Sequence, residues 1–136
     1  MTFLLDTNVV SEACKREGDP NVTRWLRGVR SSELFLSVLV IGEIRQGVER
    51  LRRRDPAQAT VFATWLARLH RDYADRLLPV TTEVAEEWGR LNAPASLAPV
   101  DALLAATAKI HGMTLVTRNT ADIARTGVAV LNPFDE

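Results

Sequence analysis

Residues 1–10, MTFLLDTNVV, decide the fold of this chain. Residues 3–5 are apolar and predict a buried strand, Asp6 ends that strand, and an apolar run typical of a helix follows almost at once. A carboxylate between a buried strand and a helix is expected at the carboxyl edge of a parallel sheet, where doubly wound α/β folds bind their ligands. Asp6 is therefore either a site residue or the N-cap of the helix.

The composition indicates one globular domain over residues 1–136. The chain is 46% hydrophobic and 25% charged, and a chain of this length buries about two-thirds of its unfolded surface on folding. The 17 basic residues balance the 17 acidic ones. A neutral chain is a poor candidate for a protein that coats nucleic acid nonspecifically, so any contact with nucleic acid must come from local patches.

The sequence also indicates where the protein works. Cys14 is the only cysteine, so no internal disulfide forms and no cysteine cluster has zinc-site spacing, which fits a reducing compartment. The N-terminus lacks the basic segment and long apolar run of a secretory signal. No apolar run reaches the roughly 18 residues that a membrane-spanning helix needs. We therefore expect a cytoplasmic protein that does not enter a membrane.

Strand and helix patterns alternate along the chain. Apolar runs predict strands at 3–5, 34–38, 77–80, 114–117 and 128–131. Helical periodicity and capping residues predict helices at 7–17, 20–30, 39–53, 55–75, 82–91, 99–111 and 119–125, with 92–96 as a loop. Because no tight hairpin signals separate the strands, we predict an α/β fold with three layers, a central, mostly parallel five-stranded sheet with helices on both faces.

The helices at 39–53 and 55–75 are expected to pair as an antiparallel hairpin with more apolar surface than the edge of a thin sheet needs. Its apolar stripe comprises Ile41, Ile44, Val48, Leu51, Phe62, Trp65, Leu69 and Tyr73. Part of this stripe is expected to bind an amphipathic segment of another chain, the alternative being that it is wholly core or homodimer contact. The many arginines along the hairpin are either a solvated face or a surface for RNA or a partner.

Four acids follow a strand closely or lie in the first turns of a helix: Asp6, Glu43, Asp101 and Asp122. Each has a structural explanation of its own, as an N-cap, a partner of a helix dipole or half of a surface ion pair. Considered together, the four acids favour a shared site. Right-handed crossovers bring the carboxyl ends of parallel strands to one edge of the sheet, which would gather all four acids around one cleft.

Such a cluster of carboxylates predicts a metal site. Like charges raise one another's pKa unless a cation compensates them. Oxygen ligands without histidine or cysteine favour Mg²⁺ or Mn²⁺ over Zn²⁺. These ions activate water and stabilise the charge that develops on a phosphodiester, so the reaction class that the acids suggest is phosphodiester hydrolysis.

Four motifs carry a resemblance to a known family. They are Leu-Leu-Asp-Thr-Asn at 4–8, Val-Leu-Val-Ile-Gly-Glu at 38–43, Asp-Ala-Leu-Leu-Ala-Ala-Thr-Ala at 101–108 and Val-Thr-Arg-Asn-Thr-Ala-Asp at 116–122. In this order they resemble the motifs of PIN-domain ribonucleases. The closing Leu-Asn-Pro-Phe at 131–134 is similar to the VapC and FitB branch of bacterial toxin–antitoxin systems. The resemblance spans the whole chain.

The resemblance implies an endoribonuclease that depends on Mg²⁺ or Mn²⁺ and acts as the toxin of a toxin–antitoxin pair. Its substrate would be RNA, its partner a cognate antitoxin, and its assembly a homodimer or a larger toxin–antitoxin complex. Asp6, Glu43, Asp101 and Asp122 match the catalytic and metal-binding acids, and Thr7, Asn8, Thr117 and Asn119 match the supporting polar positions. The family requires the fourth acid least consistently, and Ile123 stands where an aromatic residue is common.

Other classes fit less well. Aspartyl-phosphate phosphatases need a second acid two residues after the first, where this chain has Asn8. Receiver domains need an adjacent acidic pair and a late lysine, whereas Arg118 follows Thr117. A catalytically silent PIN domain that only binds RNA or a partner is the remaining alternative, and the presence of all four acids favours catalysis. No special role is expected for His70 or His111.

Overall fold

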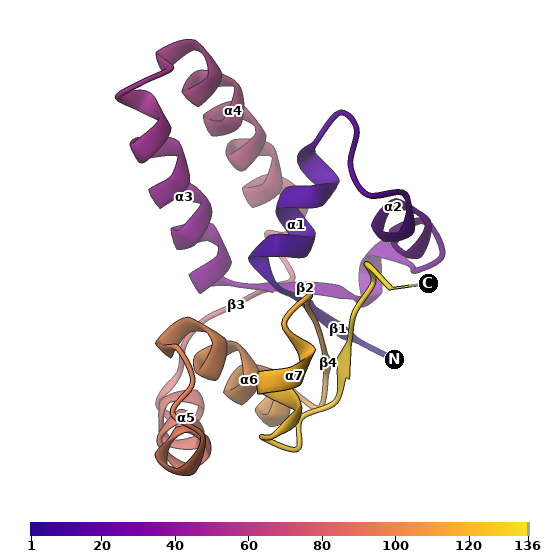
Figure 1. Ribbon diagram of the computed structural model, residues 1–136, viewed down its shortest axis with the longest axis vertical. Helices are drawn as coiled ribbons and strands as arrows, with labels where there is room; N and C mark the ends of the chain where they lie inside the picture. The colour runs from indigo at the N-terminus through magenta and orange to yellow at the C-terminus, as the bar shows by residue number, and fades with distance from the viewer. Residues whose placement is uncertain (136) are drawn as a thin grey trace.

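Five parallel strands form the middle of the molecule in the computed structural model, which describes residues 1–135. Their order is β3-β2-β1-β4-β5, so the first strand is central and the chain builds outward on both sides of it (Figure 1). Each neighbouring pair is parallel. The strands are β1 (Phe3–Leu5), β2 (Leu34–Ser37), β3 (Leu77–Leu78), β4 (Thr114–Val116) and β5 (Val130–Leu131).

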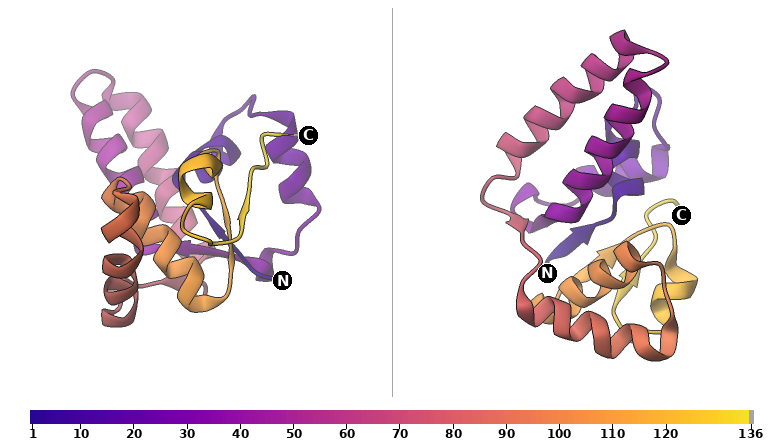
Figure 2. Two further views of the ribbon diagram at one scale, coloured as in Figure 1. Left: turned by 60° about the horizontal axis from the view of Figure 1, so that its bottom comes forward. Right: turned by 90° about the vertical axis from the view of Figure 1, so that its left-hand side faces the viewer.

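Helices cover both faces of this sheet, as the sequence predicts. Figures 1 and 2 show α1 to α4 on one face and α5 to α7 on the other, with the α3–α4 hairpin projecting from the body. The helices are α1 (Thr7–Cys14), α2 (Pro20–Arg27), α3 (Val38–Arg52), α4 (Pro56–Asp72), α5 (Thr82–Ala95), α6 (Pro99–His111) and α7 (Thr120–Ala124). The predicted α/β fold, with helices on both faces of a parallel sheet, is confirmed, and no helix within residues 1–135 is long and apolar enough to span a membrane.

The central strand is apolar throughout because helices cover it from both sides. Leu4 is fully buried, and Phe3 and Leu5 are almost so. A parallel strand buried on both faces is expected to be a continuous apolar run, since neither face meets water. The Phe3 ring also meets Trp25 of α2 edge to face, with 5.1 Å between the ring centroids, and this contact holds α2 against the sheet.

Short polar residues fix where the helices begin. Ser37, Asp55 and Thr81 each accept a hydrogen bond from a backbone N–H in the first turn of α3, α4 and α5, at distances of 3.0, 3.2 and 3.1 Å. Gly112 ends α6 in the left-handed region at φ 65°, where glycine avoids the steric cost of a Cβ. These local signals explain why α3, α4 and α5 begin within one residue of their predicted starts and why α6 ends at His111, as predicted.

The predicted loop at 92–96 is wrong, because α5 continues to Ala95 and contains Pro94. Pro94 has no N–H to donate to the carbonyl four residues earlier, so the last turn of α5 lacks one helical hydrogen bond. The helix then ends at Ser96, which has a left-handed φ of 50° and donates its N–H to Asn92 O at 3.0 Å. The helices at 7–17 and 20–30 end earlier than predicted, at Cys14 and Arg27.

Small residues and one buried acid hold α5 against α6. Ala102, Ala105 and Ala106 of α6 are fully buried, and small side chains let helices approach closely. The nearly buried Glu87 carboxylate of α5 lies 2.8 Å from Lys109 Nζ of α6. The hydrogen bond from Lys109, followed by that from Arg90, lowers the pKa of the Glu87 carboxyl. This layer is therefore closed by both apolar and ionic contacts.

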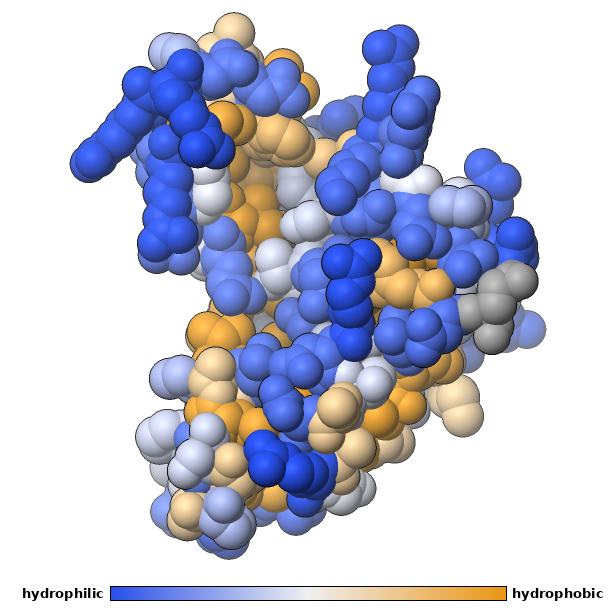
Figure 3. All heavy atoms as spheres, in the orientation of Figure 1, coloured by the Kyte–Doolittle hydropathy of each residue, from blue (hydrophilic) through white to orange (hydrophobic). Residues whose placement is uncertain are grey.

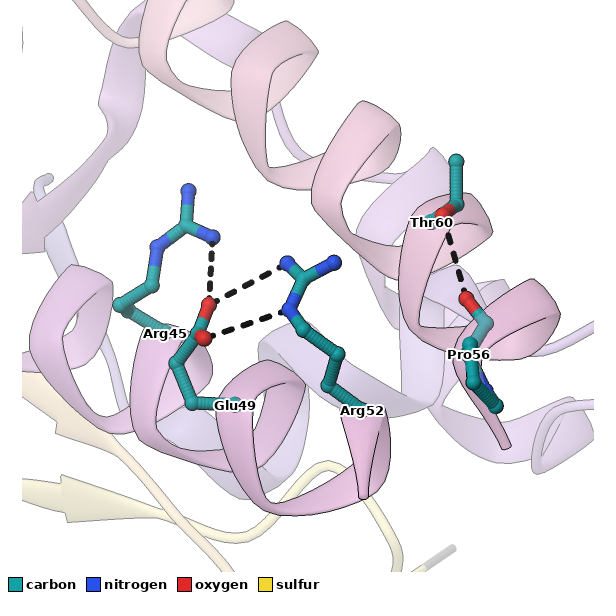
Figure 4. A network of polar contacts seen from close by, with 5 residues as sticks. All are labelled: Arg45, Glu49, Arg52, Pro56 and Thr60. Atoms are coloured by element: carbon teal, nitrogen blue, oxygen red, sulfur yellow. Dashed lines mark hydrogen bonds and ion pairs between the residues drawn. The ribbon is translucent and has the colours of Figure 1, made fainter. Parts of the chain in front are cut away.

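The exposed side of the hairpin carries polar contacts within each of its two helices. Glu49 of α3 lies between Arg45 and Arg52, with an oxygen 3.3 Å from the first and 3.2 Å from the second (Figure 4). In α4 the Thr60 hydroxyl donates to the Pro56 carbonyl at 3.1 Å. Exposed ion pairs of this kind contribute only about 0.3–0.5 kcal/mol each, so they add little to the stability of the hairpin.

Candidate functional site

Asp6 is the centre of the site, at the carboxyl end of β1 and at the N-cap of α1. One carboxylate oxygen accepts the Thr7 N–H at 2.6 Å. The other accepts the Thr117 hydroxyl at 2.7 Å and the Asn8 side-chain amide at 3.3 Å. The two roles that the sequence leaves open for Asp6 are therefore compatible, because one oxygen caps the helix while the other accepts hydrogen bonds from Asn8 of α1 and from Thr117 after β4.

Hydrogen bonds connect Asp6 to two further predicted acids. The Thr7 hydroxyl donates to the carboxylate of Glu43 from α3. On the other side, Asn119 N–H donates to Thr117 Oγ1 at 3.0 Å, and the Asn119 side-chain amide donates to the carboxylate of Asp101 at 3.3 Å. Three acids from separate parts of the chain thus belong to one polar network at the carboxyl edge of the sheet.

All four predicted supporting residues contact an acid. Thr7, Asn8 and Thr117 bind Asp6, and Asn119 binds Asp101. Threonine and asparagine donate hydrogen bonds here and so partly offset the negative charge of the carboxylates. These residues therefore hold acids that would otherwise repel one another at a defined edge of the sheet.

Asp122 lies at the margin of this network. It is exposed in the first turn of α7, and its carboxylate is 3.9 Å from the Arg125 guanidinium. It interacts electrostatically with Asp101. Within residues 1–135, no three carboxylate, histidine or thiol groups are close enough together to hold a metal ion as they stand. The four acids share one edge of the sheet, then, but interact in pairs.

Burial and repulsion make ionisation unfavourable for two of the acids. Burial raises the pKa of the Asp6 carboxyl, the neighbouring Glu43 raises it further, and the hydrogen bond from Thr117 opposes this rise. Burial likewise raises the pKa of Asp101, with smaller contributions from Asp6 and Asp122. A cation between such groups would relieve both the repulsion and the cost of burial, so the oxygen donors present here fit a hard divalent ion.

A groove begins beside these acids and extends between α1 and the hairpin. It encloses about 290 Å³ and includes Thr7 and Glu43 at the site and Arg54 near the tip of the hairpin. Figure 3 shows apolar surface in this hollow with hydrophilic side chains around its rim. Its apolar lining contains five members of the predicted stripe, Ile44, Val48, Leu51, Phe62 and Trp65.

The rest of the stripe lies elsewhere. Leu69 belongs to the buried core, and Ile41 and Tyr73 pack against that core without lining the groove. The other wall of the groove comes from Thr7, Ser11 and Cys14 of α1 and from Lys15, which caps this helix. The sequence does not reveal this wall, because α1 is too short and too polar on that side to stand out as an apolar stripe.

The family model of the PIN domain matches residues 3–129 of this chain. The chain belongs to the PIN domain family. It is 30% identical to Toxin FitB of Neisseria gonorrhoeae and 31% identical to VapC ribonuclease Y4jK of Sinorhizobium fredii, with 98% of the chain covered in both cases. The alignments include 99% and 98% of those proteins.

Solved structures agree with this assignment. The crystal structure of FitAcB from Neisseria gonorrhoeae superposes with a TM-score of 0.92 and 31% identity, over 99% of this chain and 100% of the matching chain. The PIN domain resemblance found in the four motifs is thereby confirmed along the whole molecule. The acids of this PIN domain lie where its motifs predict, at the carboxyl edge of the sheet.

Proposed function

We propose that this PIN domain is an endoribonuclease that acts as the toxin of a toxin–antitoxin pair in the cytoplasm. The observation that carries the proposal is the network that joins Asp6, Glu43 and Asp101 at the end of the central strand. Relatives of nearly the same length, named as a toxin and as a ribonuclease, support it. The reaction is hydrolysis, in which water attacks a phosphodiester of RNA and the broken phosphorus–oxygen bond leaves a hydroxyl on the second fragment.

We propose that Asp6, Glu43 and Asp101 hold Mg²⁺ or Mn²⁺, with Asp122 completing the acidic surface. A bound divalent ion would activate the attacking water and stabilise negative charge on the phosphate. The raised pKa of the Asp6 and Asp101 carboxyls supports this assignment, since a nearby cation would stabilise the ionised form of both. Thr7, Asn8, Thr117 and Asn119 orient the carboxylates through the hydrogen bonds described above.

The groove is the proposed binding site for the antitoxin. An amphipathic segment laid in it would cover the apolar faces of Leu51, Phe62 and Trp65. Because Glu43 lies at one end of the groove, a basic side chain of that segment would reach the acids and compete with the metal ion. We further propose that residues 1–136 form one domain and that the protein works as a homodimer, within a larger assembly when the antitoxin is bound.

One observation favours the silent alternative, a PIN domain that binds RNA or a partner without cutting. The acids interact in pairs and no group of three within residues 1–135 is arranged to hold a metal ion. A domain of this kind would still bind RNA but would not respond to divalent ions. The same experiment therefore decides between the two functions.

The test is cleavage of total bacterial RNA by the purified protein, with the new RNA ends mapped by sequencing. We expect cuts in Mg²⁺ or Mn²⁺, none after chelation with EDTA, and no recovery when Zn²⁺ is supplied in place of these ions. Preparations of Asp6→Asn serve as the control for contaminating nucleases. Cleavage that persists after exhaustive chelation and is absent from the Asp6→Asn preparation would reject the metal site, and RNA binding without any cleavage would establish the silent alternative.

A further inference from the structure

Arg118 stacks on Phe134 beside the acids, and this contact has no part in the network described above. The guanidinium carbon lies 3.8 Å from the centroid of the Phe134 ring. Arg118 stands between Thr117 and Asn119, the two residues that bind Asp6 and Asp101. Its own backbone N–H approaches Asn8 Oδ1 at 3.4 Å. A cation is thus held directly at the edge of an acidic site.

The ring that supports Arg118 is itself fixed. The Phe134 carbonyl accepts the Asn21 side-chain amide at 2.9 Å, and the Phe134 N–H donates to Asn132 Oδ1 at 2.9 Å. The first bond ties the closing Asn-Pro-Phe segment to the start of α2, and the second closes a turn within that segment. An arginine stacked on a fixed ring loses less side-chain freedom when it binds a ligand than a mobile arginine does.

The guanidinium has no hydrogen-bonded partner. Within residues 1–135 it makes no hydrogen bond and no ion pair, and the side chain is exposed. Its electrostatic neighbour is the Glu12 carboxylate, which already binds Lys15 and the Asp19 N–H. Two other basic residues near the acids are already paired, Lys15 with Glu12 at 2.9 Å and Arg125 with Asp122 at 3.9 Å. Arginine presents N–H groups in a planar fork that matches the oxygens of a phosphate. Stacking covers one face of the fork and leaves its edge open.

We infer that Arg118, held by Phe134, binds the RNA phosphate next to the one that is cut. This inference rests on the proposed nuclease function and adds a subsite to it. A surface with several carboxylates repels a polyanion, so a strand entering the site needs a cation close to the cut. Arg118 supplies that cation on the side of α1 that carries Asn8, whereas the groove opens on the side that carries Thr7 and Ser11.

The test uses two probes. Binding is measured with a fluorescein-labelled oligouridylate, in an Asp6→Asn background that prevents cleavage. Arg118→Ala is expected to weaken binding about tenfold and to reduce the slope of log affinity against log salt by about 0.7, the effect of one lost contact with a single-stranded phosphate. Cleavage is measured, in the otherwise unchanged protein, with an oligoribonucleotide that spans the main mapped cut. There Arg118→Ala is expected to raise KM about tenfold with little change in kcat.

Two further variants separate charge from stacking. Arg118→Lys keeps the charge, so the salt slope should be unchanged while affinity falls less than in Arg118→Ala. Phe134→Leu keeps the arginine but removes the ring, so affinity should fall by about threefold with the slope unchanged. Arg90→Ala is the matched control, since it removes an exposed positive charge from α5 on the opposite face of the sheet.

The inference is overturned if Arg118→Ala binds the oligouridylate with the affinity and salt slope of Arg90→Ala. It is also overturned if Arg118→Ala and Phe134→Leu lower the Tm while leaving KM and affinity unchanged, because the stack would then only hold the end of the chain. Failure of the nuclease proposal is a different outcome. In that case the protein cuts no RNA, yet binding of the oligouridylate still depends on Arg118.

Discussion

The two helical layers of this PIN domain supply acids to the same edge of the sheet but are packed in opposite ways. The layer of α5 to α7 provides Asp101 and is closed by buried alanines such as Ala106 and by the Glu87 carboxylate. The layer of α1 to α4 provides Glu43 and leaves an apolar groove between α1 and the hairpin. The comparison shows that one face of the sheet is built for stability, and we propose that the other is built for regulation.

Side-chain size explains much of the difference. Alanines allow α6 to lie close to its neighbours, and Ala102, Ala105 and Ala106 are fully buried there. Large residues such as Phe62 and Trp65 remain half-buried on the hairpin because α1 ends at Cys14 and cannot cover them. Exposed apolar surface with a polar rim is typical of an interaction site. The layers should therefore respond differently to similar substitutions.

The largest expected effect is loss of RNA cleavage when an acid on either side of the site is replaced. Asp6→Asn and Asp101→Asn, one acid from each side of the site, should each reduce RNA cleavage by about a hundredfold or more, since both are proposed to hold the metal ion. The Tm at pH 7, measured without metal, should be unchanged or higher, because burial raises the pKa of both carboxyls. A lower Tm with cleavage retained would mean that both residues only stabilise the starts of their helices.

The same pKa shifts predict how this stability difference depends on pH. A carboxyl whose pKa is raised in the folded protein destabilises it when ionised, and this cost disappears as the pH falls through the raised value toward the ordinary one near 3.8. Any gain in Tm of the asparagine variants over the parent should therefore be greatest at neutral pH and shrink on acidification. A gain that grows as the pH falls would contradict the assigned cause.

The second prediction tests the open layer. Leu51→Gln combined with Phe62→Gln should weaken antitoxin binding by about thirtyfold or more, as expected when apolar anchors are removed from an interface. RNA cleavage by the isolated toxin should not change. Val61→Gln is the matched control, because Val61 is 58% exposed on the same helix but does not line the groove. Antitoxin binding that survives, with loss of the dimer instead, would assign the groove to self-association.

Much of the fold could be predicted because its signals are local. Apolar runs identify the strands, and Ser37, Asp55 and Gly112 fix helix ends through bonds to their immediate neighbours. The end of α5 could not be predicted in this way. A proline normally predicts the end of a helix. In the structure α5 continues past Pro94 to Ala95, and the Ser96 N–H donates to Asn92 O at its end.

The residues of the candidate site could be proposed from the sequence, but the hydrogen bonds between them could not. The motifs identify Asp6, Glu43 and Asp101, and the structure joins them through one network. Which pairs interact depends on side-chain positions from distant segments, and no pattern along the chain contains that information. The stack of Arg118 on Phe134 is a further example, since an arginine in one motif and an aromatic residue in another do not indicate by themselves that they meet.

The last prediction tests the closed layer, where the expected effect is on stability. Ala106→Leu should destabilise the fold by about 1–3 kcal/mol, because a fully buried alanine in a closely packed helix has no space for a larger side chain. The matched control is Ala67→Leu, which makes the same change at an exposed position of α4 and should leave the Tm within a degree or so of the parent. Thermal unfolding of both variants gives the difference directly. Equal Tm values would mean that α6 accommodates a leucine as easily as the surface of the hairpin does. The contrast between the two layers would then rest on the groove alone.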